Sequence, residues 1–275
     1  MSDARAEIDR GERFAFGENW RRFLGTLTPA GIEAAGEALA RLLGTRDLAG
    51  RTLLDAGSGS GLSSLAARRL GARVTSFDFD PASVACTSAL RERHAPGDPL
   101  WTILQGSVLD RAFLAGLGQF DVVYSWGVLH HTGALWEALG NAAEAVAPRG
   151  RLAIALYNDQ GSASRLWTLA KRAYVSGPLG RGLVSLLGLP ALVAFQVAVD
   201  LVQPKSPFTR YREADARGMS QWHDWIDWLG GYPFEVARPG QVVEFLRPRG
   251  FLLERLESTQ GWGCNEFVFV RAAQR

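Results

Sequence analysis

The stretch from Leu53 to Asp80, LLDAGSGSGLSSLAARRLGARVTSFDFD, decides the fold. A short apolar run contains an acid, three glycines follow at every second position, and a helical pattern leads into a second β-rich run. Glycines let the backbone turn tightly and let a ligand approach it without obstruction from a Cβ atom. We therefore predict a strand, a loop, a helix and a second strand, with a nucleotide-type ligand at the carboxyl end of the first strand.

The spacing of the glycines argues against a nicotinamide dinucleotide and hence against a dehydrogenase. The pattern G-x-G-x-x-G would need its third glycine where the chain has Leu62 or Ser64. The chain has instead D-x-G-x-G-x-G, which runs from Asp55 to Gly61. S-adenosylmethionine (SAM) carries an ammonium and a sulfonium group and no pyrophosphate, so a carboxylate beside the loop suits SAM better than NAD.

A second acid, Asp78, ends the next predicted strand about twenty residues after the loop. From that position a carboxylate can accept hydrogen bonds from ribose hydroxyls. An isolated aspartate more often caps a helix or a turn. Because Asp55 and Asp78 both stand in register with the glycine-rich loop, we favour the cofactor site.

Short β-rich runs alternate with helical patterns from Arg51 onward, which is typical of a doubly wound α/β sheet. The last two runs are separated by too few residues for a parallel crossover, so they should pair antiparallel. We predict a Rossmann-like, seven-stranded sheet that ends in an antiparallel hairpin and carries a helical lid insertion. The predicted strands are 52–56, 73–78, 101–105, 120–125, 151–156, 250–259 and 264–272, and the predicted helices of the core are 61–70, 81–93, 110–117, 133–147 and 239–248.

These patterns divide the chain into four parts. Residues 1–50 form an N-terminal helical segment that covers the cofactor site, and 51–157 form the SAM-binding Rossmann-like core. Residues 158–238 are the helical lid insertion. Residues 239–275 supply a C-terminal helix and the hairpin that completes the sheet.

The segment from Arg51 to Leu156 resembles a class I SAM-dependent methyltransferase, of the group with ubiquinone methylases and small-molecule methyltransferases. The resemblance rests on DAGSGSG (55–61), QGSVLD (105–110) and YSWGVLHHT (124–132). It implies that the loop holds the methionine part of SAM, that Asp78 binds ribose and that Phe79 lies against adenine. Ser107 stands where the family often has Asp, so the adenine contact stays open among Ser107, Val108 and Asp110. The expected cofactor residues are Trp20, Asp55, Gly57, Ser58, Gly59, Gly61, Asp78, Phe79, Ser107, Val108 and Trp126.

Methyl transfer needs alignment of the acceptor with the donor, and it needs a base only where the acceptor must lose a proton. His130 and His131 follow the fourth strand, and His223 could pair with Asp227 at i,i+4 on a lid helix. Each histidine could equally serve structure, as a cap, a backbone partner or half of a surface pair. The residues expected to bind the substrate are Tyr157, Asn158 and Trp222. Trp20 has two possible roles: its ring either faces the sulfonium or forms a hydrophobic docking stripe with Phe16.

Composition excludes several other classes of protein. The two cysteines fit neither a disulfide framework nor a zinc motif, and no carboxylate cluster suits magnesium, so we expect no metal. The net charge of +2 without a polybasic run argues against nucleic acid, and the charged N-terminus lacks a signal peptide, which favours the cytoplasm. Pro190 and polar residues interrupt 182–202, so we predict a buried helical pair there, although contact with lipid stays open.

We predict a SAM-dependent methyltransferase that acts on a small, hydrophobic or glycosylated organic acceptor, with oxygen methylation favoured. Carbon or nitrogen methylation and a SAM-binding module without turnover are the alternatives. An aminopropyl transferase would favour acidic residues after the fourth strand, where this chain has SWGVLHHTG (125–133). The sequence leaves the acceptor and the oligomeric state open.

Overall fold

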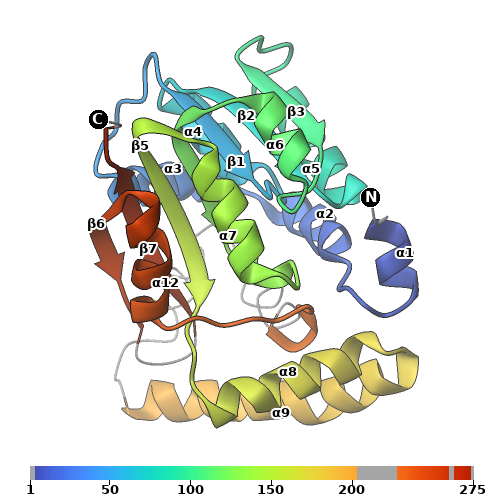
Figure 1. Ribbon diagram of the computed structural model, residues 1–275. Helices are drawn as coiled ribbons and strands as arrows, with labels where there is room; N and C mark the ends of the chain where they lie inside the picture. The colour runs from blue at the N-terminus through green and yellow to red at the C-terminus, as the bar shows by residue number, and fades with distance from the viewer. Residues whose placement is uncertain (1–3, 203–227, 260–262, 274–275) are drawn as a thin grey trace.

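The computed structural model describes residues 4–202, 228–259 and 263–273. Its centre is a seven-stranded sheet with the strand order β3-β2-β1-β4-β5-β7-β6 (Figure 1). The first five strands are parallel, and β7 runs antiparallel to both β5 and β6. The predicted architecture is therefore confirmed. The strands are β1 (Thr52–Ala56), β2 (Arg73–Asp78), β3 (Trp101–Gln105), β4 (Phe120–Trp126), β5 (Val146–Tyr157), β6 (Phe251–Glu257) and β7 (Cys264–Arg271).

Helices cover both faces of the sheet and bury a core on each side (Figure 1). On one face lie α2 (Phe16–Thr26), α3 (Pro29–Leu43), α4 (Leu62–Arg69) and α5 (Pro81–His94). On the other face lie α6 (Arg111–Leu117), α7 (Leu135–Glu144) and α12 (Pro239–Leu246). A shorter helix, α1 (Ala4–Asp9), begins the described chain.

Side-chain caps begin several of these helices where the sequence offers them. Asp80 accepts a hydrogen bond from the backbone N–H of Ala82 at the start of α5, where Pro81 has no N–H to leave unpaired. Asp110 caps α6 by accepting from Phe113 N at 2.9 Å. Asp110 is therefore engaged in the helix cap, while its neighbour Val108 is buried in the core.

The prediction for the end of α7 and the start of β5 was wrong by several residues. The helix ends at Glu144, and β5 already begins at Val146 instead of 151. The register between β4 and β5 shifts between their first paired positions, and Arg149 has φ of 64° there. An irregular start of this kind lets Pro148 and Gly150 lie within a strand, although these residue types usually indicate a loop.

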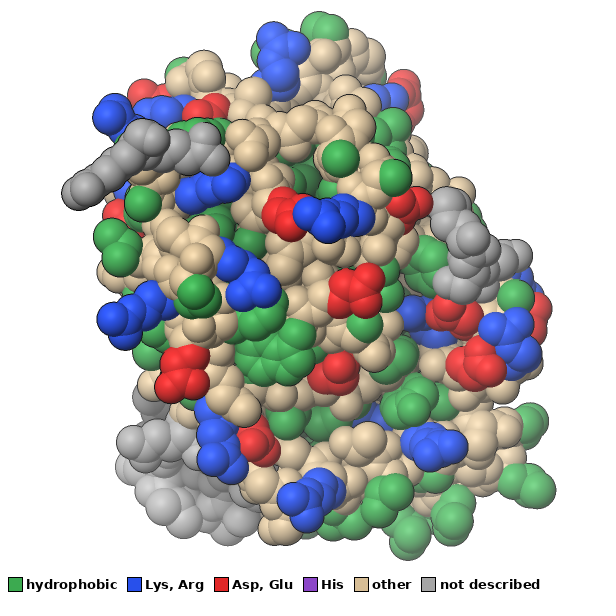
Figure 2. All heavy atoms as spheres, viewed as in Figure 1, with side chains coloured by type: hydrophobic (Ala, Val, Ile, Leu, Met, Phe, Trp, Pro, Cys, Tyr) green, Lys and Arg blue, Asp and Glu red, His purple; other side chains and the backbone are tan. Residues whose placement is uncertain are grey.

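The insertion after β5 begins with two long helices, α8 (Ser162–Val175) and α9 (Pro178–Val202), that lie side by side across the carboxyl edge of the sheet (Figure 1). The predicted buried pair over 182–202 was wrong, because this segment belongs to a single helix with Pro190 inside it. Its leucines at 183, 186 and 187 are exposed. Figure 2 shows hydrophobic side chains standing out along the lower edge, over α8 and α9. Among the described residues, no helix has the length and apolar character needed to span a membrane.

Candidate active site

The glycine-rich loop between β1 and α4 lies at the carboxyl edge of the sheet. Gly57 has φ of 87°, and a Cβ atom on it would lie 2.3 Å from Cγ1 of Val128. Gly59 has φ of 53°, and its Cβ would lie 2.9 Å from the indole nitrogen of Trp20. Both positions thus need glycine for conformation and for space. Gly61 is the N-cap residue of α4, and the Ser58 hydroxyl bonds to the Thr87 hydroxyl at 2.9 Å.

Asp55 is buried directly beneath this loop. Its Oδ2 accepts a hydrogen bond from the Ser64 hydroxyl at 2.5 Å, and that hydroxyl also lies 2.6 Å from the Ser76 hydroxyl. Burial raises the pKa of Asp55 to about 7, and repulsion from Asp78 adds to the effect, whereas the bond from Ser64 opposes it. A cation bound at the loop would reverse this shift, because it favours the ionised carboxylate.

Asp78 at the end of β2 holds two loops together. Its Oδ2 accepts from Gly59 N at 2.9 Å and its Oδ1 accepts from Asp80 N at 3.0 Å. Burial raises the pKa of Asp78 to about 6, although the two backbone donors and the positive charge of Arg13 work against the shift. Each carboxylate oxygen has further lone-pair capacity, so the group can also accept from ribose hydroxyls.

These two pKa shifts predict that SAM binding depends on pH. The dissociation constant for SAM should rise by at least about tenfold between pH 7.5 and 5.5, because Asp55 must lose a proton before it can face the ammonium. This range lies below the usual pKa of an α-amino group, so SAM itself stays protonated. Isothermal titration calorimetry measures the effect, and Asp55→Asn should leave only the smaller pH dependence that comes from Asp78. A flat profile for the wild-type protein would contradict the role of Asp55.

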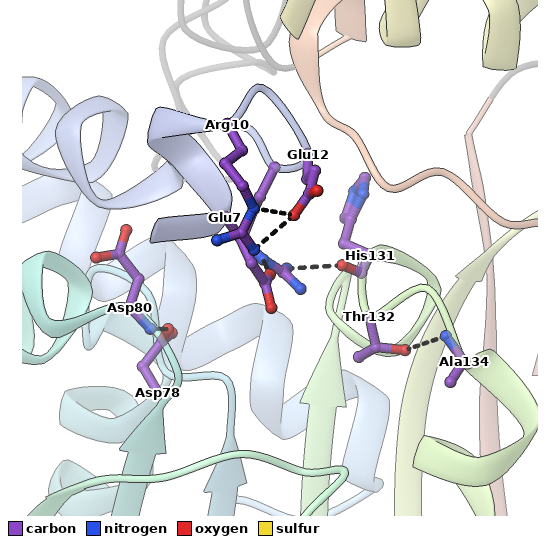
Figure 3. Close-up of polar contacts among 9 residues, drawn as sticks. Glu7, Arg10, Glu12, Asp78, Asp80, His131, Thr132 and Ala134 are labelled. Carbon is purple, nitrogen blue, oxygen red and sulfur yellow. Dashed lines mark hydrogen bonds and ion pairs between the residues drawn. The ribbon is translucent and has the colours of Figure 1, made fainter. Parts of the chain in front are cut away.

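The N-terminal segment is tied to the loops after β2 and β4. The Arg13 guanidinium donates to the carbonyl of His131 at 2.9 Å, pairs with Glu7 at 2.6 Å and lies 5.0 Å from the centre of the Phe79 ring. Figure 3 shows Glu7, Arg10 and Glu12 between Asp78 and Asp80 on one side and His131 on the other. Sequence reasoning missed Arg13, because nothing local distinguishes it from the other charged residues of this segment.

Asp80 makes a second link to the N-terminal segment. Its Oδ2 accepts from Gly17 N at 2.9 Å, at the first turn of α2. A Cβ on Gly17 would lie 2.5 Å from the Cβ of Ala82, so α2 and α5 approach each other closely at this point. This contact places Trp20, one turn further along α2, against Gly59 of the cofactor loop.

The other predicted cofactor residues lie further along the same edge. The Ser107 hydroxyl accepts from Leu109 N at 3.2 Å, and the carbonyl of Val108 accepts from the Asn141 amide at 3.0 Å. Trp126 ends β4 and remains exposed, and its indole N–H donates to Glu266 of β7 at 3.3 Å. None of these contacts prevents the segments from bordering a ligand.

His130 and His131 are both buried, and their hydrogen bonds fix their tautomers. The backbone N–H of Tyr157 donates to Nδ1 of His130 at 3.3 Å, so the proton of this ring lies on Nε2. The carbonyl of Pro233 lies 2.6 Å from Nδ1 of His131, so this nitrogen donates and Nε2 carries the lone pair. The two histidines thus join the loop after β4 to the end of β5 and to the segment before α12.

The surroundings of both histidines favour the neutral ring. Burial lowers the pKa of His131 to about 3, and the positive charges of Lys171 and Arg13 contribute. Burial also lowers the pKa of His130 well below its usual value. A ring with so low a pKa is a weak general base at neutral pH, so the geometry favours positioning over proton transfer. The third predicted base, His223, lies outside the described residues, as do Asp227 and Trp222.

An open pocket lies beside the end of β5, and it encloses about 420 Å³ including the part that opens to solvent. Tyr157 lines it, and the ring of Tyr157 lies 4.1 Å from that of His130, centre to centre. Asn158 also lines the pocket, while its amide bonds to Thr259 and Asn265. The other lining residues are Gln160, Ser164, Trp167, Lys171, Trp228, Phe234 and Gly263.

The donor set fits SAM. The buried carboxylate of Asp55 and the partly buried carboxylate of Asp78 lie beside a loop whose backbone is left open by glycines, and such a site suits a cationic ligand with a ribose. Asp55 and the loop would hold the methionine part, and Asp78 would hold the ribose. Within the described ranges, no cluster of three or more His, Cys, Asp or Glu side chains could hold a metal ion.

Comparisons with known proteins agree with this geometry. A family model described as a methyltransferase domain matches residues 54–154. The chain is 31% identical over 148 residues to a tRNA U34 carboxymethyltransferase of Methylococcus capsulatus, covering 54% of this chain and 39% of that protein. It is 32% identical over 140 residues to a ubiquinone biosynthesis O-methyltransferase of Methylobacterium sp. (strain 4-46), and the match covers 51% of this chain and 54% of that protein. The chain thus spans about half or less of the length of these relatives.

The fold is also that of a solved methyltransferase. Magnesium protoporphyrin IX methyltransferase from Synechocystis PCC 6803, solved with bound SAM, superposes with a TM-score of 0.58 at 14% sequence identity. The match covers 99% of this chain and 98% of that one. The glycine-rich loop, the two acids and the mixed sheet thus occur together in a chain whose residues 54–154 match the methyltransferase-domain model and whose fold is that of a solved SAM-binding methyltransferase.

Proposed function

We propose that this protein transfers the methyl group of SAM to a small organic acceptor with aromatic or apolar character, and that oxygen is the methylated atom. The observation that carries the proposal is the position of the pocket. Tyr157 lines it and contacts His130, which follows β4, while the cofactor loop follows the neighbouring strand β1. Donor and acceptor would therefore meet at one edge of the sheet.

The walls of the pocket support an apolar acceptor. Four aromatic side chains line it, and the ammonium of Lys171 lies 4.9 Å from the ring centre of Phe234 and 5.9 Å from that of Tyr157. Aromatic walls bind flat organic groups well, and one buried ammonium would select an acceptor that presents an oxygen. The aromatic lining residues are Tyr157, Trp167, Trp228 and Phe234.

The residues of the chain would mainly align the acceptor with the methyl donor. Bound SAM would supply a methyl group that is already activated, so in-line alignment and exclusion of water remain for the protein. Lys171 would donate to the acceptor oxygen and favour its ionised form, which attacks the methyl carbon as the C–S bond breaks. Arg13 and Asp80 would hold the N-terminal helices over the cofactor, with Trp20 against the loop.

A methyl-transfer assay tests the proposal. The protein and methyl-labelled SAM are incubated separately with a panel of phenols and hydroquinones, with primary amines and with unmodified tRNA. We expect S-adenosylhomocysteine and labelled product only with the oxygen acceptors. Label in amines or tRNA would contradict the acceptor class, and SAM binding without S-adenosylhomocysteine would indicate a binding module.

The pocket predicts how a variant should alter this assay. Trp167→Ala removes one aromatic wall and should raise the KM for the acceptor by about tenfold while leaving the SAM dissociation constant unchanged. Trp136→Ala is the matched control, because Trp136 packs against Phe245 of α12 and does not line the pocket. Equal kinetic effects of the two substitutions would contradict the assignment of the pocket.

A further inference from the structure

The outer face of α8 and α9 carries an apolar surface that the described parts of the chain leave uncovered. Its side chains range from 44% exposed at Val193 to 91% exposed at Leu179. Most of the exposed large hydrophobic side chains among the described residues lie here. We call this set the leucine face: Leu166, Leu169, Leu179, Leu183, Leu186, Leu187 and Val193. Large exposed apolar patches mark sites of interaction with a partner or a membrane.

Helical spacing separates the leucine face from the pocket. Ser164, Trp167 and Lys171 recur at intervals of three and four residues and line the pocket on one side of α8. Leu166 and Leu169 are offset from these positions and project from the opposite side. The inner side of α8 therefore bounds the pocket, while its outer side contributes to the apolar surface.

Charge distinguishes among the occupants that could cover this surface. From Ser162 to Val193 the sequence contains no Asp or Glu, whereas Arg165 and Arg172 of α8 are exposed. A second copy docked through the same face would bring together two surfaces that carry exposed arginines and no carboxylate, which is unfavourable. An anionic surface would instead pair with them. In Figure 2, Lys or Arg side chains lie among the hydrophobic ones along this edge.

We propose that the leucine face docks on the surface of an anionic phospholipid bilayer. The leucines would enter the boundary between headgroups and acyl chains, and the arginines would contact lipid phosphates. Helices that lie in the interface need one apolar face and do not need to span the membrane. The pocket would then lie about one helix diameter, ~10 Å, from the lipid, within reach of an acceptor dissolved in it. This surface is separate from methyl transfer and can be tested without an acceptor.

Vesicle co-sedimentation of the full chain tests the proposal. We expect the protein to sediment with vesicles of equal parts phosphatidylcholine and phosphatidylglycerol, and more weakly with phosphatidylcholine alone. The triple variant L183Q/L186Q/L187Q should bind the mixed vesicles at least about tenfold more weakly. The matched control is L252Q/L253Q, which removes two exposed leucines from the edge strand β6 and should bind normally. SAM binding by all variants confirms that they fold.

Two further measurements complete the test. R165Q/R172Q should weaken binding to the mixed vesicles and leave binding to phosphatidylcholine unchanged, because it removes only charge. The proposal is overturned if the wild-type protein fails to sediment with mixed vesicles, or if the triple variant and the β6 control behave alike. Light scattering that shows a wild-type dimer and a monomeric triple variant would also overturn it, in favour of a second copy.

Discussion

Replacing Gly57 with alanine is expected to lower the affinity for SAM by about 100-fold, equivalent to about 2.7 kcal/mol. Gly57 has φ of 87°, and a Cβ atom would lie 2.3 Å from Cγ1 of Val128. A left-handed alanine costs about 1–2 kcal/mol, and overpacking of this kind adds about 1–3 kcal/mol. The free loop can relax to relieve this strain, but SAM needs the original shape, so the cost is expressed in the binding affinity.

The chain offers a matched control for this substitution. Gly97 also has positive φ, 67°, but no heavy atom lies within 4 Å of the Cβ that Gly97→Ala would add. That variant should lose about 1 kcal/mol of stability and bind SAM normally. Val128→Ala combined with Gly57→Ala removes the clashing methyl groups and should restore part of the affinity. Normal SAM binding by Gly57→Ala alone, measured by calorimetry, would show that this loop does not hold the cofactor.

The second large effect is expected from Asp78→Ala, which should weaken SAM binding by about 100-fold and acceptor binding much less. The substitution removes the proposed ribose contact. It also leaves the backbone N–H groups of Gly59 and Asp80 without the acceptor that now fixes them. Charge-assisted hydrogen bonds contribute about 1.5–3 kcal/mol each, so the loss is large even if water replaces part of it.

Asp121→Ala is the control for Asp78→Ala. Asp121 also accepts from a backbone N–H and from a side chain, both of Thr52, but it lies where β1 and β4 begin, at the opposite edge of the sheet. Its loss should lower the melting temperature without changing the SAM dissociation constant. Equal losses of SAM and acceptor affinity in Asp78→Ala would mean that Asp78 supports the whole edge and not the ribose alone.

Local sequence determined the fold and the cofactor loop. The alternation of glycines after Asp55 needs only the chemistry of neighbouring residues, because positive φ and close backbone approach are local requirements. The antiparallel pairing of β6 and β7 followed from the short connection between them, whereas the strand order was seen only in the structure. The start of β5 was missed, because Pro148 and Gly150 read as a loop while the sheet accommodates them in an irregular strand.

The tertiary structure decided which side chains surround the site and which face the solvent. Arg13 bonds to the backbone of His131 across 118 positions of sequence, and Lys171 meets Phe234 in one pocket. No periodicity encodes such contacts, because they depend on how separate elements pack. The exposed leucines of α9 are another example. An apolar sequence predicts a buried helix, and only the packing of neighbouring elements decides whether its side chains are covered. The sequence by itself determined a SAM loop on a mixed sheet, whereas only long-range packing decided how that loop is enclosed and which surface is left to meet a partner.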